Sequence, residues 1–266
     1  MKKGFILIVL LAVVCAGALF YSTTVYNSKI REAASVKSAK QPPSESSTPL
    51  TKNEASTESE KVLAAPKGDL LAENLFPNVK SLMQKRFADG ENVQMLIIGS
   101  GAIQPVAERF ATALTEKFGE SVTVDAVTAD MTSPQFIEQG LPEIDWSTGY
   151  DIVIYEPFTL KNNGEVVIER EQQDLMKVKN TALESVKDAV FIVTPPQPIF
   201  QANYYDRQVS ALKNFTAANN IPFVDHWTSW PATNSKDLLE FVGKDQSLTN
   251  RGVQTWSNAL IQTFLK

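Results

Sequence analysis

The 266-residue chain is short of histidine and cysteine, with one of each, and these shortages exclude several classes of site. A single cysteine rules out a disulfide framework and a cysteine-based zinc cluster. A single histidine rules out metal sites of the HExxH type, so any imidazole that acts as a general base must be His226. Hydrophobic residues make up 43% of the chain and charged residues 21%, which predicts a large folded core.

Basic residues are also too few for a nucleic-acid partner. The formal net charge is -5 and the isoelectric point is about 5.1. A nucleic-acid footprint needs a clustered basic surface, and no basic cluster accompanies the aromatic residues of this chain. We therefore expect no nucleic-acid partner.

An uncharged apolar run occupies the N-terminus. It extends for 18 residues from Gly4 to Tyr21 and follows Lys2 and Lys3. A membrane-spanning helix needs roughly 20 apolar residues, with about 17 as the lower limit, and preceding lysines stay in the cytoplasm. Residues 1–27 are therefore predicted to be a signal anchor. The protein would be a single-pass protein of the cell membrane with its C-terminal domain outside.

Two alternatives compete with the anchor. Ala16-Gly17-Ala18 resembles a small-residue cleavage site, and cleavage there would release a secreted protein. Cys15 is a candidate for lipid attachment, although bulky Val14 precedes it. We interpret Cys15 as an apolar helix residue. All three readings deliver the rest of the chain to the outer side of a membrane.

A polar stretch separates this segment from the rest of the chain. Residues 41–49 and 51–61 contain mainly serine, proline, threonine and charged residues, with little to bury. Such a composition is typical of a flexible tether. We predict an extracytoplasmic linker over residues 28–66 and a folded domain over residues 67–266.

Strands and helices alternate along the predicted domain. Such an alternation predicts an α/β fold of three layers, with helices on both faces of a parallel sheet. Nearly continuous apolar strands fit burial on both faces. We expect a flavodoxin-like sheet of five strands in the order 2-1-3-4-5. The predicted strands are residues 93–98, 121–127, 151–155, 189–194 and 221–224, and the predicted helices are residues 105–118, 169–186, 205–219 and 252–265.

Polar residues follow three of the predicted strands. Ser100 follows the first strand, Asn162 and Asn163 the third, and Asp225 and His226 the fifth. Ligands of open parallel sheets bind beyond the carboxyl ends of the strands. All three sets are therefore expected at one edge of the sheet.

Ser100 lies between two glycines, Gly99 and Gly101. Glycines allow a tight strand-to-helix turn and close approach by a substrate. The following helix start would offer backbone N–H groups to an oxyanion. Ser100 is therefore a candidate nucleophile, but the same tripeptide also suits an ordinary turn. It matches neither a GxSxG elbow nor a dinucleotide-binding fingerprint.

The order of these parts over residues 90–266 resembles the SGNH/GDSL-type hydrolases. That family has a serine block after the first strand, an asparagine block after the third, and a late Asp/His block before the last helix. Residues 97–101 are similar to the serine block, although the usual Gly-Asp-Ser is absent and Ser100 directly follows Gly99. Residues 155–164 occupy the place of the asparagine block. Together with the His-Trp-x-x-Trp-Pro segment at residues 226–231, they resemble a membrane-anchored Gram-positive branch of the family.

The late block departs from the family pattern. Members place Asp-x-x-His before Pro-Asn, whereas residues 244–252 contain no histidine and Ser247 stands where the catalytic histidine would be. One reading makes His226 the replacement base, oriented by Asp225 or by Asp245. The other makes His226 a hydrogen-bonded structural residue.

The resemblance implies a set of site residues and a class of activity. Ser100 would attack a carbonyl, His226 would move the proton, Asp225 would orient His226, and Asn163 would donate to the oxyanion. Secondary candidates are Gly101, Asn162, Asp130 and Asp245. The implied enzyme is an esterase, deacetylase or acetyltransferase that acts on cell-envelope carbohydrate without metal or organic cofactor. Its substrate would be a polysaccharide or another acyl ester. The alternative is a catalytically inactive SGNH fold that serves as a surface binding or scaffolding protein.

Overall fold

The computed structural model describes residues 67–202 and 204–266. The anchor and linker predicted over residues 1–27 and 28–66 lie outside the described residues. Within the described ranges, no helix combines the length and the apolar composition that crossing a bilayer requires.

A four-stranded parallel sheet forms the middle layer of the described domain, in the order β2-β1-β3-β4. Its register pairs Ile97 with both Ala126 and Ile154, and residues of β1 are almost entirely buried because the strand has neighbours on both sides. The strands are β1 (Val93–Ser100), β2 (Val122–Ala129), β3 (Ile152–Tyr155) and β4 (Val190–Val193).

The prediction of a fifth strand over residues 221–224 is wrong. Phe223 forms an isolated parallel bridge with Val193, supported by Val193 N–H donating to the Pro222 carbonyl and Val224 N–H donating to the Val193 carbonyl, both at 2.8 Å. Pro222 has no N–H to extend the ladder. The chain then turns into a short 3₁₀ helix, Trp227–Ser229, so the pairing ends after one bridge.

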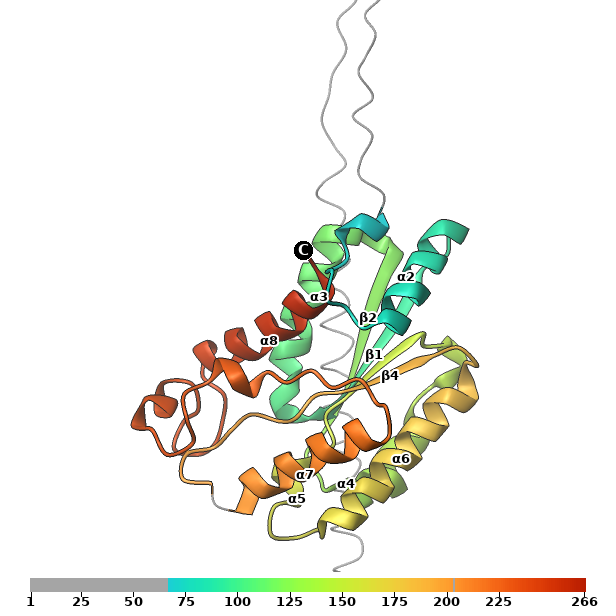
Figure 1. The fold of residues 1–266 in the computed structure, drawn as a ribbon. Coiled ribbons are helices and arrows are strands. Elements are labelled where there is room, and N and C mark those ends of the chain that lie inside the picture. Colours follow the sequence, from blue (N-terminus) through green and yellow to red (C-terminus); the bar gives the residue numbers. More distant parts are fainter. Residues whose placement is uncertain (1–66, 203) are drawn as a thin grey trace, which may run out of the picture. The chain divides into compact units, whose positions relative to one another are not determined.

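Helices cover both faces of the sheet, as the alternation predicted (Figure 1). Side chains of β1 alternate between two cores: Met95 and Ile97 face one, and Leu96 and Ile98 face the other. The first core is closed by α2 (Pro77–Asp89), α3 (Gln104–Phe118) and α8 (Asn250–Phe264), and the second by α6 (Ile168–Ser185) and α7 (Tyr204–Ala218), with α4 (Ser133–Gln135) and α5 (Thr159–Asn162) beside them.

The predicted apolar face of α3 is confirmed, because Val106, Phe110, Leu114 and Phe118 are all buried.

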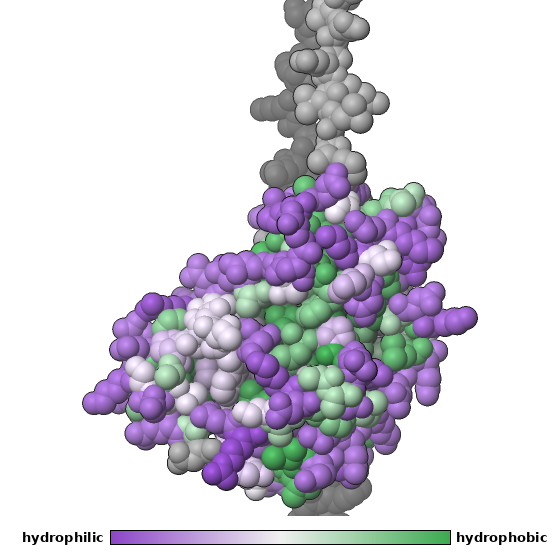
Figure 2. All heavy atoms as spheres, viewed as in Figure 1, coloured by the Kyte–Doolittle hydropathy of each residue, from purple (hydrophilic) through white to green (hydrophobic). Residues whose placement is uncertain are grey.

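Short helical turns connect the main elements. Hydrophilic residues cover most of the face seen in Figure 2, with hydrophobic residues gathered near its middle. The short turns are Lys67–Leu70, Gly101–Ile103, Gly119–Ser121, Phe136–Gly140, Leu141–Glu143, Trp146–Thr148, Trp227–Ser229 and Lys236–Glu240.

Candidate functional site

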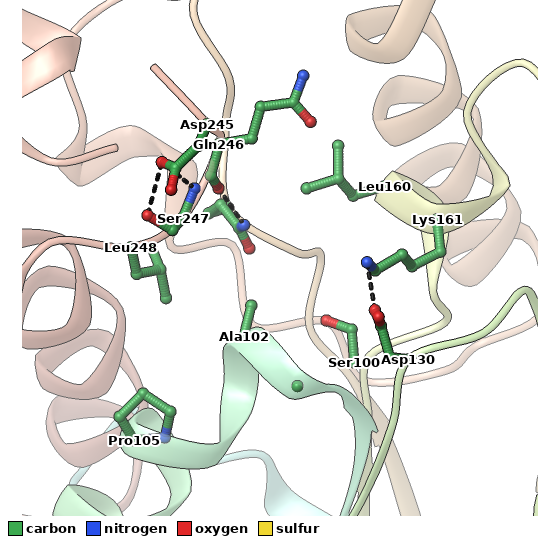
Figure 3. A pocket seen from close by; sticks show the side chains of 12 residues that line it. Ser100, Ala102, Pro105, Asp130, Leu160, Lys161, Asp245, Gln246, Ser247 and Leu248 are labelled. Atoms are coloured by element: carbon green, nitrogen blue, oxygen red, sulfur yellow. Dashed lines mark hydrogen bonds and ion pairs between the residues drawn. The ribbon is translucent and has the colours of Figure 1, made fainter. Parts of the chain in front are cut away.

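A cavity of about 480 Å³ opens at the carboxyl edge of the sheet, where the sequence placed the ligand site. Figure 3 shows Asp245, Ser247 and Leu248 on one side, Lys161 and Asp130 on the other, and Ser100 between them. The lining comes from the ends of β1 and β2, from the turn after β1 and the start of α3, from α5, from the segment after β4 and from the loop before α8. It consists of Ser100, Gly101, Ala102, Pro105, Asp130, Leu160, Lys161, Gln197, Asp245, Gln246, Ser247 and Leu248.

The end of β1 is tied to the end of β3 by a buried carboxylate. Glu156 follows β3 and is fully buried. Its Oε2 accepts the backbone N–H of Ser100 at 2.6 Å, and its Oε1 accepts the N–H of Phe158 at 2.8 Å. Burial raises the pKa of Glu156, and the hydrogen bonds from Ser100 and Phe158 oppose that rise. The Ser100 N–H is therefore already engaged and is not offered to an oxyanion.

Gly99 permits this contact. A Cβ at Gly99 would lie 2.7 Å from the Glu156 Cβ and 2.9 Å from its Oε2, which is closer than real Cβ atoms approach. Phe158 completes the turn in the left-handed region, with φ of 62°, which is costly for a bulky residue. Gly99 therefore leaves room for the carboxylate of Glu156, which the sequence analysis did not select as a site residue. The glycine before Ser100 was the one sign in the sequence of a group packed against this turn.

Charged and polar side chains form the two sides of the cavity. Lys161 and Asp130 form an ion pair on one side. On the other, the carboxylate of Asp245 accepts the hydroxyl of Ser247 at 2.7 Å, and hydrogen bonds from Ser247 lower the pKa of Asp245. Gln197 is buried between the sides and donates from Nε2 to the Gln246 carbonyl at 3.0 Å. Its Oε1 has no partner among the described residues.

His226 is not among the residues that line this cavity. The ring is fully buried and stacks on Trp256 with ring centres 4.6 Å apart. The indole N–H of Trp230 donates to Nδ1 at 2.9 Å. An indole nitrogen can only donate, so Nδ1 accepts, and Nε2 carries the proton and bonds the Pro195 carbonyl at 2.8 Å.

The predicted pairing of His226 with Ser100 is therefore not formed. Both ring nitrogens are held by the core, and burial lowers the pKa of His226 to about 4, so the neutral ring persists at neutral pH. Asp225 does not orient this ring either. Its carboxylate accepts from Lys213 Nζ at 2.6 Å and from the Trp227 N–H at 3.2 Å. Of the two readings of His226, the geometry matches the structural one.

The two asparagines lie away from the cavity lining. Asn163 is half-buried at the end of α5. Asn162 is fully buried in a polar cluster, where its Oδ1 accepts the Ser133 N–H at 2.9 Å and its Nδ2 donates to Glu171 at 2.7 Å. The Asn162 amide is therefore occupied within the protein, while Gly101, Asp130 and Asp245 do line the cavity with Ser100.

The raised pKa of Glu171 in this cluster predicts how the stability of the protein changes with pH. Burial raises the pKa of its carboxyl to about 7, against hydrogen bonds from Asn162 and Thr159. The folded state then binds a proton that the unfolded state releases near pH 4.5, so stability falls as the pH rises from 4.5 to 7, by about 3 kcal/mol from this group. Chemical unfolding of Glu171→Gln should lack this component, whereas the exposed neighbour variant Glu169→Gln should keep it. An identical pH profile for wild type and Glu171→Gln would contradict it.

Two positions that line the cavity can be aligned with the serine and histidine of the resembled SGNH/GDSL pattern. In ungapped register with Gly-Asp-Ser, Ser100 takes the aspartate position and Gly101 the serine position. Counted from Asp245, the Asp-x-x-His spacing places Leu248 at the histidine position, one residue beyond Ser247. Gly101, Asp245 and Leu248 all line the same cavity. In that register Gly101 and Leu248 would stand where the resembled pattern has its serine and histidine.

Comparison with known proteins gives matches in structure. No protein-family model matches the chain, and no curated protein matches its sequence. A peptidoglycan O-acetylesterase matches with a TM-score of 0.57 at 9% identity, over 73% of this chain and 97% of its own. A Parabacteroides merdae protein described as a GDSL-like lipase matches with a TM-score of 0.55 at 12% identity, over 65% and 95%. An acetylxylan esterase from Geobacillus stearothermophilus matches with a TM-score of 0.51 at 13% identity, over 65% and 94%.

The described domain therefore has the three-layer α/β fold, and within that class it has the fold of the SGNH/GDSL hydrolases. The resemblance seen in the sequence is confirmed for the fold. The assignment to a Gram-positive branch stays a prediction.

Proposed function

We propose that the chain binds acylated carbohydrate in the Ser100 cavity without hydrolysing it. The observation that carries this proposal is the state of His226: the one imidazole of the chain is buried with both nitrogens hydrogen-bonded, away from the cavity. Proton transfer to a general base needs hydrogen-bond contact. The alternative function that the sequence left open, a binding module on a hydrolase fold, is thus favoured.

Two features support a carbohydrate ester as the ligand. The fold is shared with a peptidoglycan O-acetylesterase and an acetylxylan esterase, proteins named for acetylated carbohydrates. The cavity also offers polar groups to a sugar: Ser247, the Lys161 and Asp130 pair, and the unpartnered Oε1 of Gln197. A buried acceptor without a partner favours a ligand that brings an N–H or O–H donor.

Binding to the full-length protein tests this function. We expect acetylated xylan oligomers or O-acetylated peptidoglycan fragments to bind measurably by calorimetry. Ala102→Arg should weaken binding at least tenfold, because it adds a long charged side chain to the cavity lining. Glu116→Arg, an exposed change on α3 outside this lining, should bind like the wild type. Failure of both ligands to bind, or equal binding by Ala102→Arg, would reject the proposal.

Ester hydrolysis by Ser100 is the second candidate function. Ser100 lines the cavity together with Lys161, and Lys161 would have to leave its ion pair with Asp130 and lose a proton before it accepts the serine proton. A serine nucleophile needs such a base within hydrogen-bond reach. In this case Ser100→Ala and Lys161→Met would each abolish acetate release.

We also propose that the chain is anchored in the cell membrane with its domain outside. The support is the uncharged run from Gly4 to Tyr21 behind two lysines. Protease added to intact cells should digest the domain, and deletion of residues 1–27 should move the protein from the membrane fraction to the soluble fraction. A domain protected in intact cells would contradict this orientation.

A further inference from the structure

A second cavity, of about 420 Å³, is lined in part by the segment that follows β4. Gln197 lines the first cavity and Pro198, its neighbour in the chain, lines the second. The walls come from one side of α7 and from the segment between Phe223 and Thr233. The lining residues are Pro198, Asp206, Val209, Ser210, Lys213, Phe223, Asp225, Trp227, Trp230, Pro231, Ala232 and Thr233.

Two tryptophans give this cavity aromatic walls whose polar atoms are already used. The indole N–H of Trp227 donates to the Pro196 carbonyl at 2.7 Å, and that of Trp230 donates to His226. Trp227 is also packed on Tyr205, with ring centres 5.7 Å apart. The rings are thus fixed before any ligand arrives, and they present carbon surface rather than donors. Such surface suits the C–H face of a ring-shaped ligand.

Asp206 supplies the cavity with an unsatisfied acceptor. Its Oδ2 accepts the Thr233 hydroxyl at 2.9 Å, whereas its Oδ1 is shielded from solvent and has no partner among the described residues. A buried carboxylate oxygen without a donor is costly. Asp206 lies in the first turn of α7, where the helix dipole stabilises part of the negative charge of its carboxylate. A ligand donor would satisfy the remaining oxygen.

The other charges in this cavity leave it net acidic. Lys213 is paired with Asp225 at 2.6 Å, so Asp206 is the carboxylate left without a cation. The acidic balance disfavours inorganic anions and acidic sugars. The combination selects a ligand with an apolar ring face and a donor at its edge.

We infer that this second cavity binds a saccharide ring, neutral or amino-substituted. The ring lies against Trp227 and Trp230, and a hydroxyl or ammonium group donates to Asp206 Oδ1. This site does not need the acyl group that the Ser100 cavity is proposed to bind.

The test uses the full-length protein and sugars that carry no ester. Tryptophan fluorescence is followed during titration with N-acetylglucosamine oligomers and with their de-N-acetylated counterparts. Wild type should show a saturable change with at least one of them. Tighter binding of the de-N-acetylated oligomer identifies an ammonium donor, and equal or weaker binding identifies a hydroxyl donor.

Variants assign the binding to the second cavity. Asp206→Ala should weaken binding at least tenfold, and so should Ser210→Arg, which changes an exposed residue of α7 that lines the cavity. Ser210→Arg keeps the test valid if Asp206→Ala fails to fold. Asp145→Ala, which removes a capping carboxylate elsewhere, should retain binding. Absence of wild-type binding to either oligomer, or wild-type affinity in both Asp206→Ala and Ser210→Arg, would overturn the inference.

Discussion

A Gly101→Ser, Leu248→His double variant should release acetate from acetylated carbohydrate, roughly 10²–10⁴ times faster than the wild type. The range is that of a positioned general base. The new serine has room, since no heavy atom of the described residues beyond Gly101 and its chain neighbours lies within 4 Å of a Cβ built on Gly101. The new histidine would follow Asp245 at the family spacing, from a half-buried position that lines the same cavity. Acetate release from acetylated xylan oligomers is the measurement.

Matched variants separate chemistry from shape in that experiment. Gly101→Ala with Leu248→Asn changes the same positions without a nucleophile or a base, and it should stay at the wild-type rate. Each single variant should also stay near that rate, because nucleophile and base act as a unit. A folded double variant no faster than the Ala/Asn pair would contradict the register that places the lost catalytic groups at Gly101 and Leu248.

His226→Phe should lower the free energy of unfolding by about 3 kcal/mol and leave ligand binding in the Ser100 cavity unchanged. Phenylalanine keeps a ring to stack on Trp256, but it leaves the Trp230 N–H and the Pro195 carbonyl without partners. Each buried group left unsatisfied costs about 1–3 kcal/mol. Urea unfolding measures the loss, and calorimetry below the unfolding transition measures the binding.

The pH dependence of this stability identifies the same group. Burial lowers the pKa of His226 from 6.5 to about 4, so between these values the unfolded state binds a proton that the folded state does not. The His226 contribution to stability is therefore lost as the pH falls from 6.5 to 4, opposite in sign to that of Glu171. His226→Phe should remove this component. A variant with unchanged stability that loses ligand binding would instead place His226 in the site.

The sequence predicted the parts of the fold that repeat a simple period. The apolar face of α3 and the apolar β1 follow directly from spacing, and both are confirmed. The fifth strand failed because Pro222 and the turn at Trp227 limit its pairing to one bridge, and this depends on where the neighbouring strand ends. Periodicity reports which residues are buried, but it does not report how far a ladder extends.

The site was harder to predict because it depends on contacts that form only when the chain folds. Sequence order placed Ser100, the two asparagines and the Asp225–His226 pair at one sheet edge, but of these only Ser100 is among the residues that line the cavity there. The secondary candidates Asp130 and Asp245 line it with Ser100. No local pattern indicated that Trp230 and Pro195 hold both nitrogens of His226, since those contacts join residues brought together by folding. Glu156 was missed for a similar reason: a carboxylate after an apolar strand resembles a solvated turn until its partner, the Ser100 N–H, is in place.

Acetate release by the full-length wild-type protein, at a concentration of acetylated ligand that saturates binding, is the measurement that tests the central claim most directly. The account predicts binding with release no faster than that of Ser100→Ala, because the cavity contains no imidazole and the Ser100 N–H is held by Glu156. Release by the wild type that Ser100→Ala abolishes would contradict it.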